Sequence, residues 1–359
     1  MIRAAFLTSQ SLEAVSGNNT TLRRLARSLA ARGIAVAPFS LAASTGEGLL
    51  EEMGRFGPDV IHGFHACKAG PAARALARQL RIPFVVTATG TDLHVEVFDS
   101  ARREILIPVL REAGAVLLGD WEGIGERLLE IRVPRERIRV VPKGVELPDR
   151  SLLAPASGGP SEENVLFLLP AGWREVKNNL FPLEPLAAVR LQEPGLRLRF
   201  LGPVLDAAYR AALNTERFPF AEDGGTVPAG DMGREYLRAG VVLNVSHAEG
   251  VANAVLEAMA WGRPVLAADI SANRAIMAWD ERAPERSTGV LYGTAPSGKA
   301  WRRIHDAEDF AAKALLLLRD RDLRAALGRM ARAAVERDHT PEREAEAVLA
   351  AYRDCAITS

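Results

Sequence analysis

Short apolar runs alternate with longer amphipathic stretches along the first part of the chain. The apolar runs are rich in Val, Ile, Leu and Phe, which is typical of strands buried in a parallel sheet. The stretches between them carry apolar side chains at helical spacing. We expect strands at residues 3–8, 34–40, 59–64, 83–90, 115–120 and 138–144. We expect helices at residues 20–33, 48–58, 69–81, 105–114 and 122–131.

The alternation stops at residues 145–163, where Pro, Gly, Ser and acidic residues accumulate, and it resumes at residue 164. Such a composition is typical of a linker. Beyond it we expect strands at residues 164–172, 196–202, 225–230, 241–246, 264–270 and 289–293. We expect helices at residues 179–192, from about 206, at 231–240, at 253–262 and over much of 307–353.

Two successive series of alternating strands and helices predict an α/β fold with two Rossmann-like domains, each built on a parallel sheet, facing one cleft. A chain of 359 residues is also too long for one ordinary core. We therefore expect an N-terminal domain, a linker, a second domain and a C-terminal helix that packs back toward the first domain. These parts are placed at residues 1–148, 149–163, 164–335 and 336–359.

Composition narrows the class of protein further. Lys+Arg and Asp+Glu are both 45, so no global charge recruits nucleic acid or an anionic membrane, and we expect neither partner. We expect neither a signal peptide nor a transmembrane segment. The two cysteines suit a reducing cytoplasm, where we expect the protein to reside. The six histidines lack metal-ligand spacing, and we expect no metal site.

The segment EGVANAVLEAMAWGRPV places two acids around the start of a predicted helix. Glu249 lies in the loop after a strand and Glu257 about one turn into the helix. The start of a helix carries free N–H groups and partial positive charge, which bind anions. Two acids that flank such a site suit a molecule with hydroxyl groups on both sides of a diphosphate, as in a nucleotide sugar. In the plainer interpretation Glu249 is solvated and Glu257 pairs with an arginine.

Two basic residues follow the strand predicted at 164–172. Arg174 and Lys177 lie where that strand ends, and ligands of open α/β sheets bind at this edge. A guanidinium fork beside a compact ammonium suits two adjacent phosphates. The alternative is that both side chains are solvated.

Loops after the first strands of the chain also carry polar residues. Gly17 allows close backbone approach, and Asn18 or a neighbour could cap the next helix. The loops at 62–70 and 85–94 place further polar side chains at the sheet edge: His65, Lys68, Thr89, Thr91 and Asp92. A histidine at such a position is more often structural than catalytic, and Asp92 could cap a helix. Asp320-Arg321-Asp322 matches a DxD metal motif, but it precedes a helical pattern and we interpret it as a helix cap.

Taken together, these motifs resemble those of family 4 glycosyltransferases of the GT-B fold, over essentially the whole chain. The resemblance rests on the glycine-bearing first loop and on DVIH, TGTD, PKGVE, GWREVK and EGVANAVLEAMAWGRPV. The last motif is specific, and the others become so through their order. Within the family, HACKAG and FLLPAGWREVKN look closest to the selenosugar synthases and to the animal glycosyltransferase one-domain-containing proteins.

The resemblance implies transfer of a sugar from a nucleotide-diphosphate donor, most often UDP-linked, with retention at the anomeric carbon. The domain at 1–148 would then be the acceptor domain and the domain at 164–335 the nucleotide-sugar domain. It implies neither an obligatory metal nor a cofactor besides the nucleotide sugar. Arg174 and Lys177 would neutralise the leaving diphosphate, Glu257 would hold the ribose and Glu249 the donor sugar. Further donor contacts are implied for Gly17, Asn18, Gly250, Val251, Ala252 and Asn253.

Two positions depart from the family pattern. Thr89 stands where many members carry a histidine near the reaction centre, and Lys143 stands in place of the usual asparagine before Gly-Val. The departures are compatible with an acceptor that is already a strong nucleophile, such as a phosphate-like anion of the selenophosphate type. Lys68 or Lys143 would hold it, with His65, Thr89 and Asp92 on the same acceptor side.

Two other functions suit the same architecture. One is a nucleotide-sugar-binding protein that does not catalyse transfer, and the other is an epimerase that acts on a UDP-sugar. The pair of acids at 249 and 257 favours transfer over both.

Overall fold

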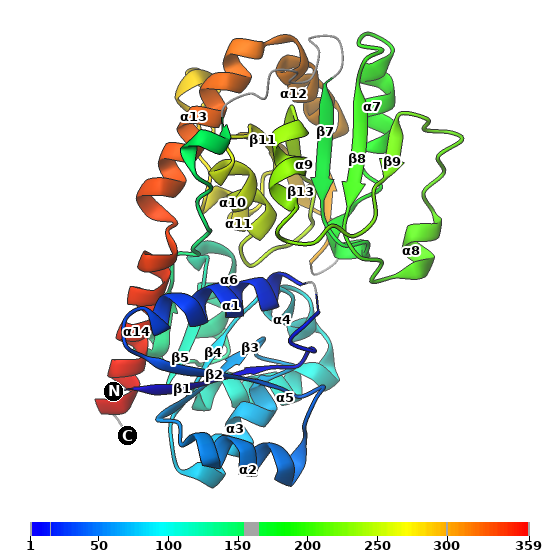
Figure 1. The fold of residues 1–359 in the computed structure, drawn as a ribbon. Helices are drawn as coiled ribbons and strands as arrows, with labels where there is room; N and C mark the ends of the chain where they lie inside the picture. The colour runs from blue at the N-terminus through cyan, green and yellow to red at the C-terminus, as the bar shows by residue number, and fades with distance from the viewer. Residues whose placement is uncertain (1, 15, 154–164, 299–300, 358–359) are drawn as a thin grey trace. The chain divides into compact units, whose positions relative to one another are not determined.

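The computed structural model describes residues 2–14, 16–153, 165–298 and 301–357 (Figure 1). These residues form two compact units. The first comprises Met1–Gly144, Glu249–Val251 and His339–Ser359, and the second comprises Val145–Ala248 and Ala252–Asp338. Of the linker predicted at 149–163, residues 154–163 lie outside the described part of the chain.

The first unit is built on a six-stranded sheet in which all neighbouring strands are parallel. The strands lie in the order β2-β1-β3-β4-β5-β6. Their bounds are Arg3–Thr8 (β1), Ala35–Ser40 (β2), Val60–Phe64 (β3), Phe84–Thr87 (β4), Ala115–Leu118 (β5) and Ile138–Val140 (β6). Each falls within a stretch predicted as a strand, so this part of the prediction is confirmed.

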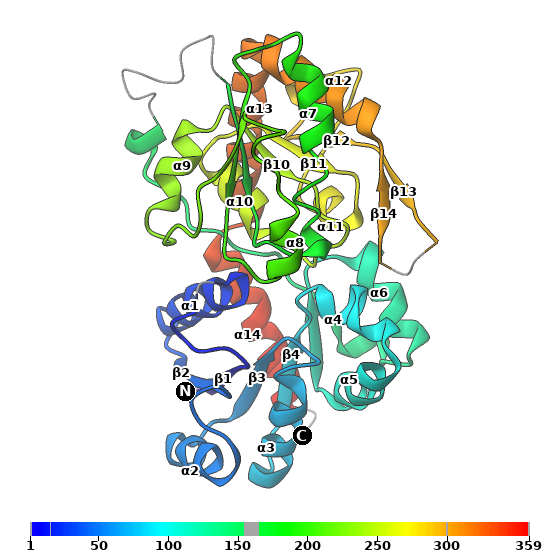
Figure 2. The ribbon, with the colours of Figure 1, turned by 90° about the vertical axis from the view of Figure 1, so that its right-hand side faces the viewer.

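Alternate residues of the strands face opposite sides of this sheet, and each side has its own apolar core. Ala4 and Phe6 of β1 join α1 (Gly17–Ala30) and α14 (Pro341–Ile357), which lie side by side in Figures 1 and 2. Ala5 and Leu7 belong to the core on the other side. The helices that contribute to that core are α2 (Gly46–Phe56), α3 (Gly70–Leu80), α4 (Thr91–His94), α5 (Ser100–Glu112) and α6 (Trp121–Glu130).

The second unit repeats this architecture with another six-stranded parallel sheet, in the order β12-β11-β10-β7-β8-β9. The strands span Leu166–Pro170 (β7), Arg197–Leu201 (β8), Ala221–Asp223 (β9), Val241–Asn244 (β10), Val265–Ala268 (β11) and Val290–Tyr292 (β12). The helices span Leu183–Arg190 (α7), Ala207–Ala211 (α8), Met232–Arg238 (α9), Asn253–Ala260 (α10), Ser271–Arg274 (α11), Ala307–Arg319 (α12) and Arg321–Asp338 (α13). Two parallel α/β sheets confirm the predicted fold class.

Two details of the second unit differ from the prediction. The strand predicted at 225–230 is wrong, because the strand that pairs with β8 is β9 and the chain leaves the sheet at Gly224. The β13 (Thr294–Pro296) and β14 (Arg303–His305) hairpin was not predicted at all. The strands β9, β13 and β14 are each three residues long, and β9 and β14 carry charged side chains, so all three lack the apolar run that marks a buried strand.

A buried ion pair ties the last helix to the first unit. The guanidinium of Arg24 on α1 donates to the two carboxylate oxygens of Glu344 on α14, at 2.9 and 3.2 Å. Their side chains are 5% and 4% exposed. Deeper along α14, the hydroxyl of Tyr352 lies 2.6 Å from Nδ1 of His62 on β3. These polar contacts fix the register of α14 against the sheet.

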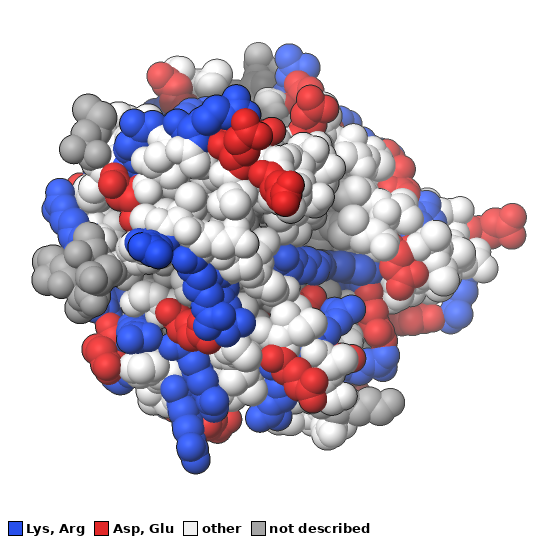
Figure 3. All heavy atoms as spheres, turned by 90° about the horizontal axis from the view of Figure 1, so that it is seen from below, with Lys and Arg blue, Asp and Glu red and all other residues white. Residues whose placement is uncertain are grey.

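The surface carries charges of both signs. Acidic and basic side chains lie interspersed over the face seen in Figure 3. Among the described residues, every helix is too short or too polar to cross a bilayer.

The Arg24–Glu344 pair leads to a prediction about stability. We expect Glu344→Ala to lower the free energy of unfolding by about 3 kcal/mol, because it leaves a buried guanidinium without its counter-charge. Urea unfolding followed by circular dichroism measures the change. Glu346→Ala is the matched control: this acid of the same helix pairs with Arg32 but is 66% exposed, so about 0.5 kcal/mol or less is expected. Equal effects of the two substitutions would contradict the account.

Candidate functional site

Two neighbouring strands of the second unit end at the same edge of the sheet and lead into the loops that carry predicted donor residues. β10 runs parallel to β7, with Val241 opposite Phe167. The carboxyl ends of parallel neighbours meet at one edge, where open α/β sheets bind ligands. The loop after β7 holds Arg174 and Lys177, and the loop after β10 leads into α10.

A backbone hydrogen bond joins these two loops directly. The N–H of His247, just beyond β10, donates to the carbonyl oxygen of Val176 at 2.9 Å. Val176 lies in a short 3-10 turn, Glu175–Lys177, which is closed by the bond from the N–H of Lys177 to the carbonyl of Arg174, also 2.9 Å. The structure therefore brings two motifs that are about seventy residues apart in the chain into one place.

Arg174 has an N–H group that can donate a further hydrogen bond. Its side chain is half-buried, and its Nε is buried with no hydrogen-bond partner among the residues that the structure describes. The neighbouring acid, Glu175, pairs with Arg302 and not with Arg174. A buried guanidinium N–H without an acceptor is costly, so this geometry favours a ligand that supplies one.

The start of α10 supplies a second group of hydrogen-bond donors, its first backbone N–H groups. The helix begins at Asn253, and the residue before it, Ala252, has no side chain that could cap the first N–H groups. One turn further, Glu257 accepts a hydrogen bond of 2.7 Å from the hydroxyl of Tyr236 on α9. Burial, reinforced by Glu257, raises the pKa of Tyr236 well above 10, so the phenol keeps its proton and orients the carboxylate.

The segment Glu249–Val251 belongs to the first unit, whereas Arg174, Lys177, Ala252, Asn253 and Glu257 all belong to the second. Within the first unit Gly250 lies against the turn at Thr89 and Gly90. A Cβ added to Gly250 would come within 2.8 Å of the carbonyl oxygen of Thr89. The glycine is thus required by backbone packing in the first unit.

The first unit has its own sheet edge, where β3 and β4 end side by side. Asp92 is fully buried there, and its carboxylate accepts hydrogen bonds from the backbone N–H groups of both loops. The donors, at 2.9 to 3.1 Å, are Ala66, Thr89, Gly90 and Leu93. These contacts make Asp92 the connector between the two loops.

His65 stands beside Asp92 in a left-handed backbone conformation, with φ of 84°. Such a conformation is strained for a residue other than glycine and often occurs at functional sites. Its Nε2 lies 3.2 Å from the hydroxyl of Thr91, and its side chain is 3% exposed. The structure thus brings together His65, Thr89 and Asp92 from the predicted acceptor side.

The remaining first-unit candidates differ in their exposure. Lys68 is exposed, Gly17 is exposed at the start of α1, and Asn18 is half-buried on the first turn of that helix. The predicted cap at Asn18, Asn19 or Thr20 is wrong, because the helix begins earlier and the hydroxyl of Ser16 accepts from the N–H of Asn19 at 3.2 Å. Lys143 is half-buried. Desolvation, helped by Arg24 and opposed by Glu344, lowers the pKa of Lys143 to about 8.

Three residues of the second unit were not found from the sequence. Tyr236 bonds to Glu257 of α10, His247 bonds to Val176, and His305 bonds to His247. Only His247 had a usable signal, because it directly follows a predicted strand. Tyr236 looks like any apolar residue of an amphipathic helix, and His305 lies in the hairpin that was not predicted.

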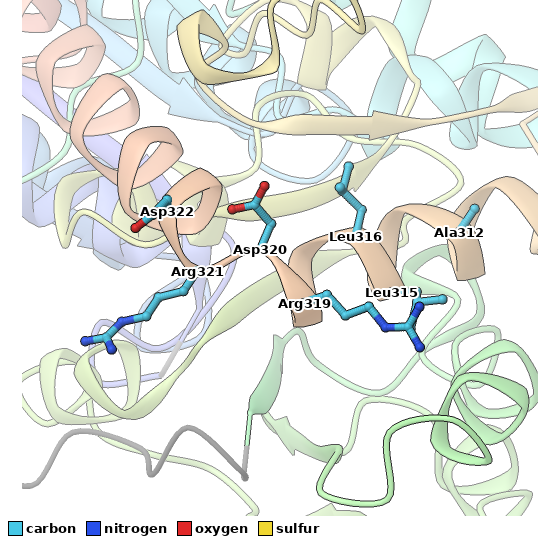
Figure 4. Close-up of a pocket in the computed structure, with 7 residues that line it drawn as sticks. All are labelled: Ala312, Leu315, Leu316, Arg319, Asp320, Arg321 and Asp322. Carbon is cyan, nitrogen blue, oxygen red and sulfur yellow. The ribbon is translucent and has the colours of Figure 1, made fainter.

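The DxD match is a helix cap, as predicted. The carboxylate of Asp320 accepts from the N–H of Leu323 at 2.8 Å, at the start of α13. The side chains of Asp320 and Asp322 point in different directions beside an open depression on α12 and α13 (Figure 4). That depression includes none of the predicted donor or acceptor residues. Among the described residues, no group of three or more His, Cys, Asp or Glu is arranged to hold a metal ion.

Two family models match the chain. The one described as a glycosyl transferase 4-like domain matches residues 38–144. The one described as glycosyl transferase-like matches residues 180–350. Each match therefore falls mainly on one of the two units.

Curated relatives are similar over part of their length. Glycosyltransferase 1 domain-containing protein 1 of Xenopus tropicalis is 27% identical over 231 residues, covering 60% of this chain and 63% of that protein. A sulfoquinovosyl transferase of Arabidopsis thaliana is 27% identical over 318 residues, covering 84% of this chain and 57% of that protein. The chain thus spans less than two thirds of the length of either relative.

Solved structures match the fold over its whole length. Sucrose-phosphate synthase from Thermosynechococcus elongatus has a TM-score of 0.77 at 20% identity and full coverage of both chains. HepE of Anabaena, in complex with UDP-glucose, has a TM-score of 0.73 at 16% identity, covering 100% of this chain and 99% of that one. At these identities the likeness concerns the fold.

The lowered pKa of Lys143 predicts a pH dependence of stability. An ordinary lysine in the unfolded chain titrates near 10.5, whereas the folded one titrates at about 8. Between these values the unfolded state binds more protons, so stability rises as pH increases from 8 toward 10.5. Lys143→Met should flatten this rise, which is measured by chemical unfolding at several pH values. Lys68→Met, at an exposed position, is the control; the same pH profile for wild type and Lys143→Met would refute the assignment.

Proposed function

We propose that this chain, which has the GT-B fold and matches glycosyl transferase family models in two separate parts, transfers a sugar from a UDP-sugar to a small acceptor. The complex of Anabaena HepE with UDP-glucose supports a UDP-linked donor on this fold. The resemblance of single motifs to the selenosugar synthases supports a more specific reaction, for which the acceptor side is considered below.

The observation that carries the proposal is the hydrogen bond between His247 and Val176, which joins the loop of Arg174 and Lys177 to the loop that precedes α10. A diphosphate bound at this edge of the sheet would meet two cations and the first N–H groups of α10. Those are the groups that anions bind most strongly in proteins. The buried Nε of Arg174 would gain the acceptor that it lacks among the described residues.

The two acids take the hydroxyl groups of the same donor in this proposal. Glu257, oriented by Tyr236, accepts from the ribose hydroxyls, and Glu249 accepts from the donor sugar. Backbone groups of Gly250, Val251, Ala252 and Asn253 contact the sugar and phosphates. The family resemblance assigns Gly17 and Asn18, at the start of α1, to the same nucleotide sugar.

Catalysis in this proposal is electrostatic. Arg174, Lys177 and the start of α10 stabilise the negative charge that develops on the departing UDP, so neither a metal nor another cofactor is needed. Removing one such donor typically costs on the order of 3 kcal/mol of transition-state stabilisation, or about a hundredfold in rate. Retention at the anomeric carbon follows the family pattern.

For the acceptor we propose a phosphate-like anion such as selenophosphate. Lys143 and the exposed Lys68 supply positive charge on the first unit, and Lys143 keeps that charge below a pH of about 8. His65 and Thr89, held in place by Asp92, line the same side.

Product analysis tests the function directly. The protein would be incubated with UDP-glucose, UDP-galactose and UDP-N-acetylglucosamine, each with phosphate, thiophosphate or selenophosphate and with simple sugars, and read by mass spectrometry. A glycosylated acceptor together with free UDP is expected. UDP binding without sugar release under all conditions would favour a binding protein, and an altered donor sugar without an acceptor would favour an epimerase.

The diphosphate role of the basic pair leads to the next prediction. We expect Arg174→Ala combined with Lys177→Ala to weaken UDP binding at least a hundredfold in calorimetry, since two charge-assisted contacts are removed. The matched control is Arg286→Ala with Arg329→Ala, which removes the same charge from exposed positions of the same unit. Equal affinities in the two double variants would show that the effect is one of net charge only.

The proposed contact between Glu257 and the ribose predicts its own pattern of ligand affinities. Glu257→Ala should weaken UDP and UDP-glucose to the same extent, about tenfold, because both ligands carry the ribose. Tyr236→Phe keeps the carboxylate but removes its orienting hydroxyl, and a smaller loss of affinity is expected. If Glu257→Ala lowered only the melting temperature and left both affinities intact, the acid would be structural.

A further inference from the structure

Three ring side chains form a hydrogen-bonded row in the second unit. The row ends at His247, in the loop between β10 and α10, which is bonded to the loop of Arg174 and Lys177. The hydroxyl of Tyr292, at the end of β12, lies 2.7 Å from Nδ1 of His305 on β14. Nε2 of His305 lies 3.0 Å from Nδ1 of His247. The backbone N–H of Arg303 donates to the same Nδ1 of His247 at 3.2 Å.

This geometry determines where the protons lie. A backbone N–H only donates, so Nδ1 of His247 must be an acceptor without a proton. Nε2 of His305 must then be the donor to that same nitrogen, which leaves Nδ1 of His305 to accept from Tyr292. In its neutral form His247 therefore carries its single proton on Nε2.

Burial keeps the three rings neutral. Tyr292 is fully buried, and desolvation raises its pKa well above 10, so the phenol remains a donor. Desolvation lowers the pKa of His305 to about 3, with His247 and Arg303 acting in the same direction. Desolvation also lowers the pKa of His247.

The hairpin that supplies His305 contacts both loops, the one of Arg174 and Lys177 and the one of His247. Arg302, at its second strand, pairs with Glu175 in the turn between Arg174 and Lys177. Arg303 and His305 bind His247 in the other loop. Figure 2 shows the hairpin, in orange, leaving the sheet after β12. The contacts make β13–β14 a brace for the carboxyl edge of the sheet.

We propose that Tyr292 and His305 hold His247 so that its Nε2–H is a fixed, uncharged donor to a diphosphate oxygen of the nucleotide sugar. None of the described residues accepts a hydrogen bond from this nitrogen, and His247 is only half-buried. Its backbone is bonded to Val176, within the turn of Arg174 and Lys177, so a diphosphate held by that pair lies nearest to it. His247 is a binding residue here, and His305 and Tyr292 are positioning residues. The role rests on the proposed function.

Uridine diphosphate is the probe that tests the ligand contact, by calorimetry at pH 7.5. His247→Leu should lower the affinity on the order of tenfold, because a hydrogen bond to a charged oxygen is lost. His247→Gln places an N–H at the same distance along the side chain and should stay within about threefold of wild type. His305→Leu should lower the affinity although it removes no ligand contact, and His305→Gln should restore most of it. Melting temperatures measured in parallel identify a variant that is misfolded.

Nitrogen-15 chemical shifts of the histidine rings test the proton positions in the row Tyr292–His305–His247 without any ligand. His247 in the full-length protein should show a protonated Nε2 and an unprotonated Nδ1 between pH 6 and 8. The charged groups around it are Arg174, Glu175, Lys177, Arg302 and Arg303. A doubly protonated His247 ring, or a single proton on its Nδ1, would contradict the proposed arrangement of protons.

The outcomes separate this inference from the function on which it rests. If the wild-type protein does not bind UDP, both the proposed function and the ligand role of His247 fail. If wild type binds UDP and folded His247→Leu binds it equally well, only the role of His247 fails. Loss of affinity in His247→Leu with rescue in His247→Gln supports it.

Discussion

The parallel pairing of β7 with β10 is the constraint on which the proposed donor site of the second unit depends. It places the ends of two strands together although they are far apart in the chain. The hydrogen bond from His247 to Val176 then carries this proximity from the strands into their loops. Without that pairing, the cations of one loop and the helix start of the other would have no reason to act on the same ligand.

Near that edge, the acidic side chains of the second unit have hydrogen-bond or ion-pair partners, whereas the Nε–H of Arg174 has none among the described residues. Glu175 is neutralised by Arg302, and Glu257 is oriented by the hydroxyl of Tyr236. The buried Nε of Arg174 stays without an acceptor among the described residues. Orphan donors beside a helix start are what a preorganised anion site requires, because the protein does not have to rearrange when the charge arrives.

Much of this could be predicted from the sequence, since it depends on local patterns. The alternation of apolar runs and amphipathic helices predicts both sheets, and the loops after strands then locate Arg174, Lys177 and Glu257. His305, Tyr292 and the brace they form were missed because β13 and β14 are three residues long and carry no apolar alternation. The contact between Tyr236 and Glu257 joins two helices, and single-sequence periodicity contains no information about such pairs.

On the first unit, the structure changes how Asp92 is understood. Its carboxylate is occupied by four backbone donors, so its part in acceptor binding would be to shape the loops of His65 and Thr89. The sequence indicated the edge correctly but could not distinguish a residue that contacts a ligand from one that holds the loop. The motif likeness to selenosugar synthases stays a prediction.

The most direct test of the central claim is a crystal structure of the protein with UDP bound. The account predicts that the diphosphate lies within hydrogen-bonding distance of Arg174 and Lys177 and of the first N–H groups of α10, with the ribose at Glu257. A diphosphate bound elsewhere, with Arg174 and Glu257 both facing solvent, would contradict it.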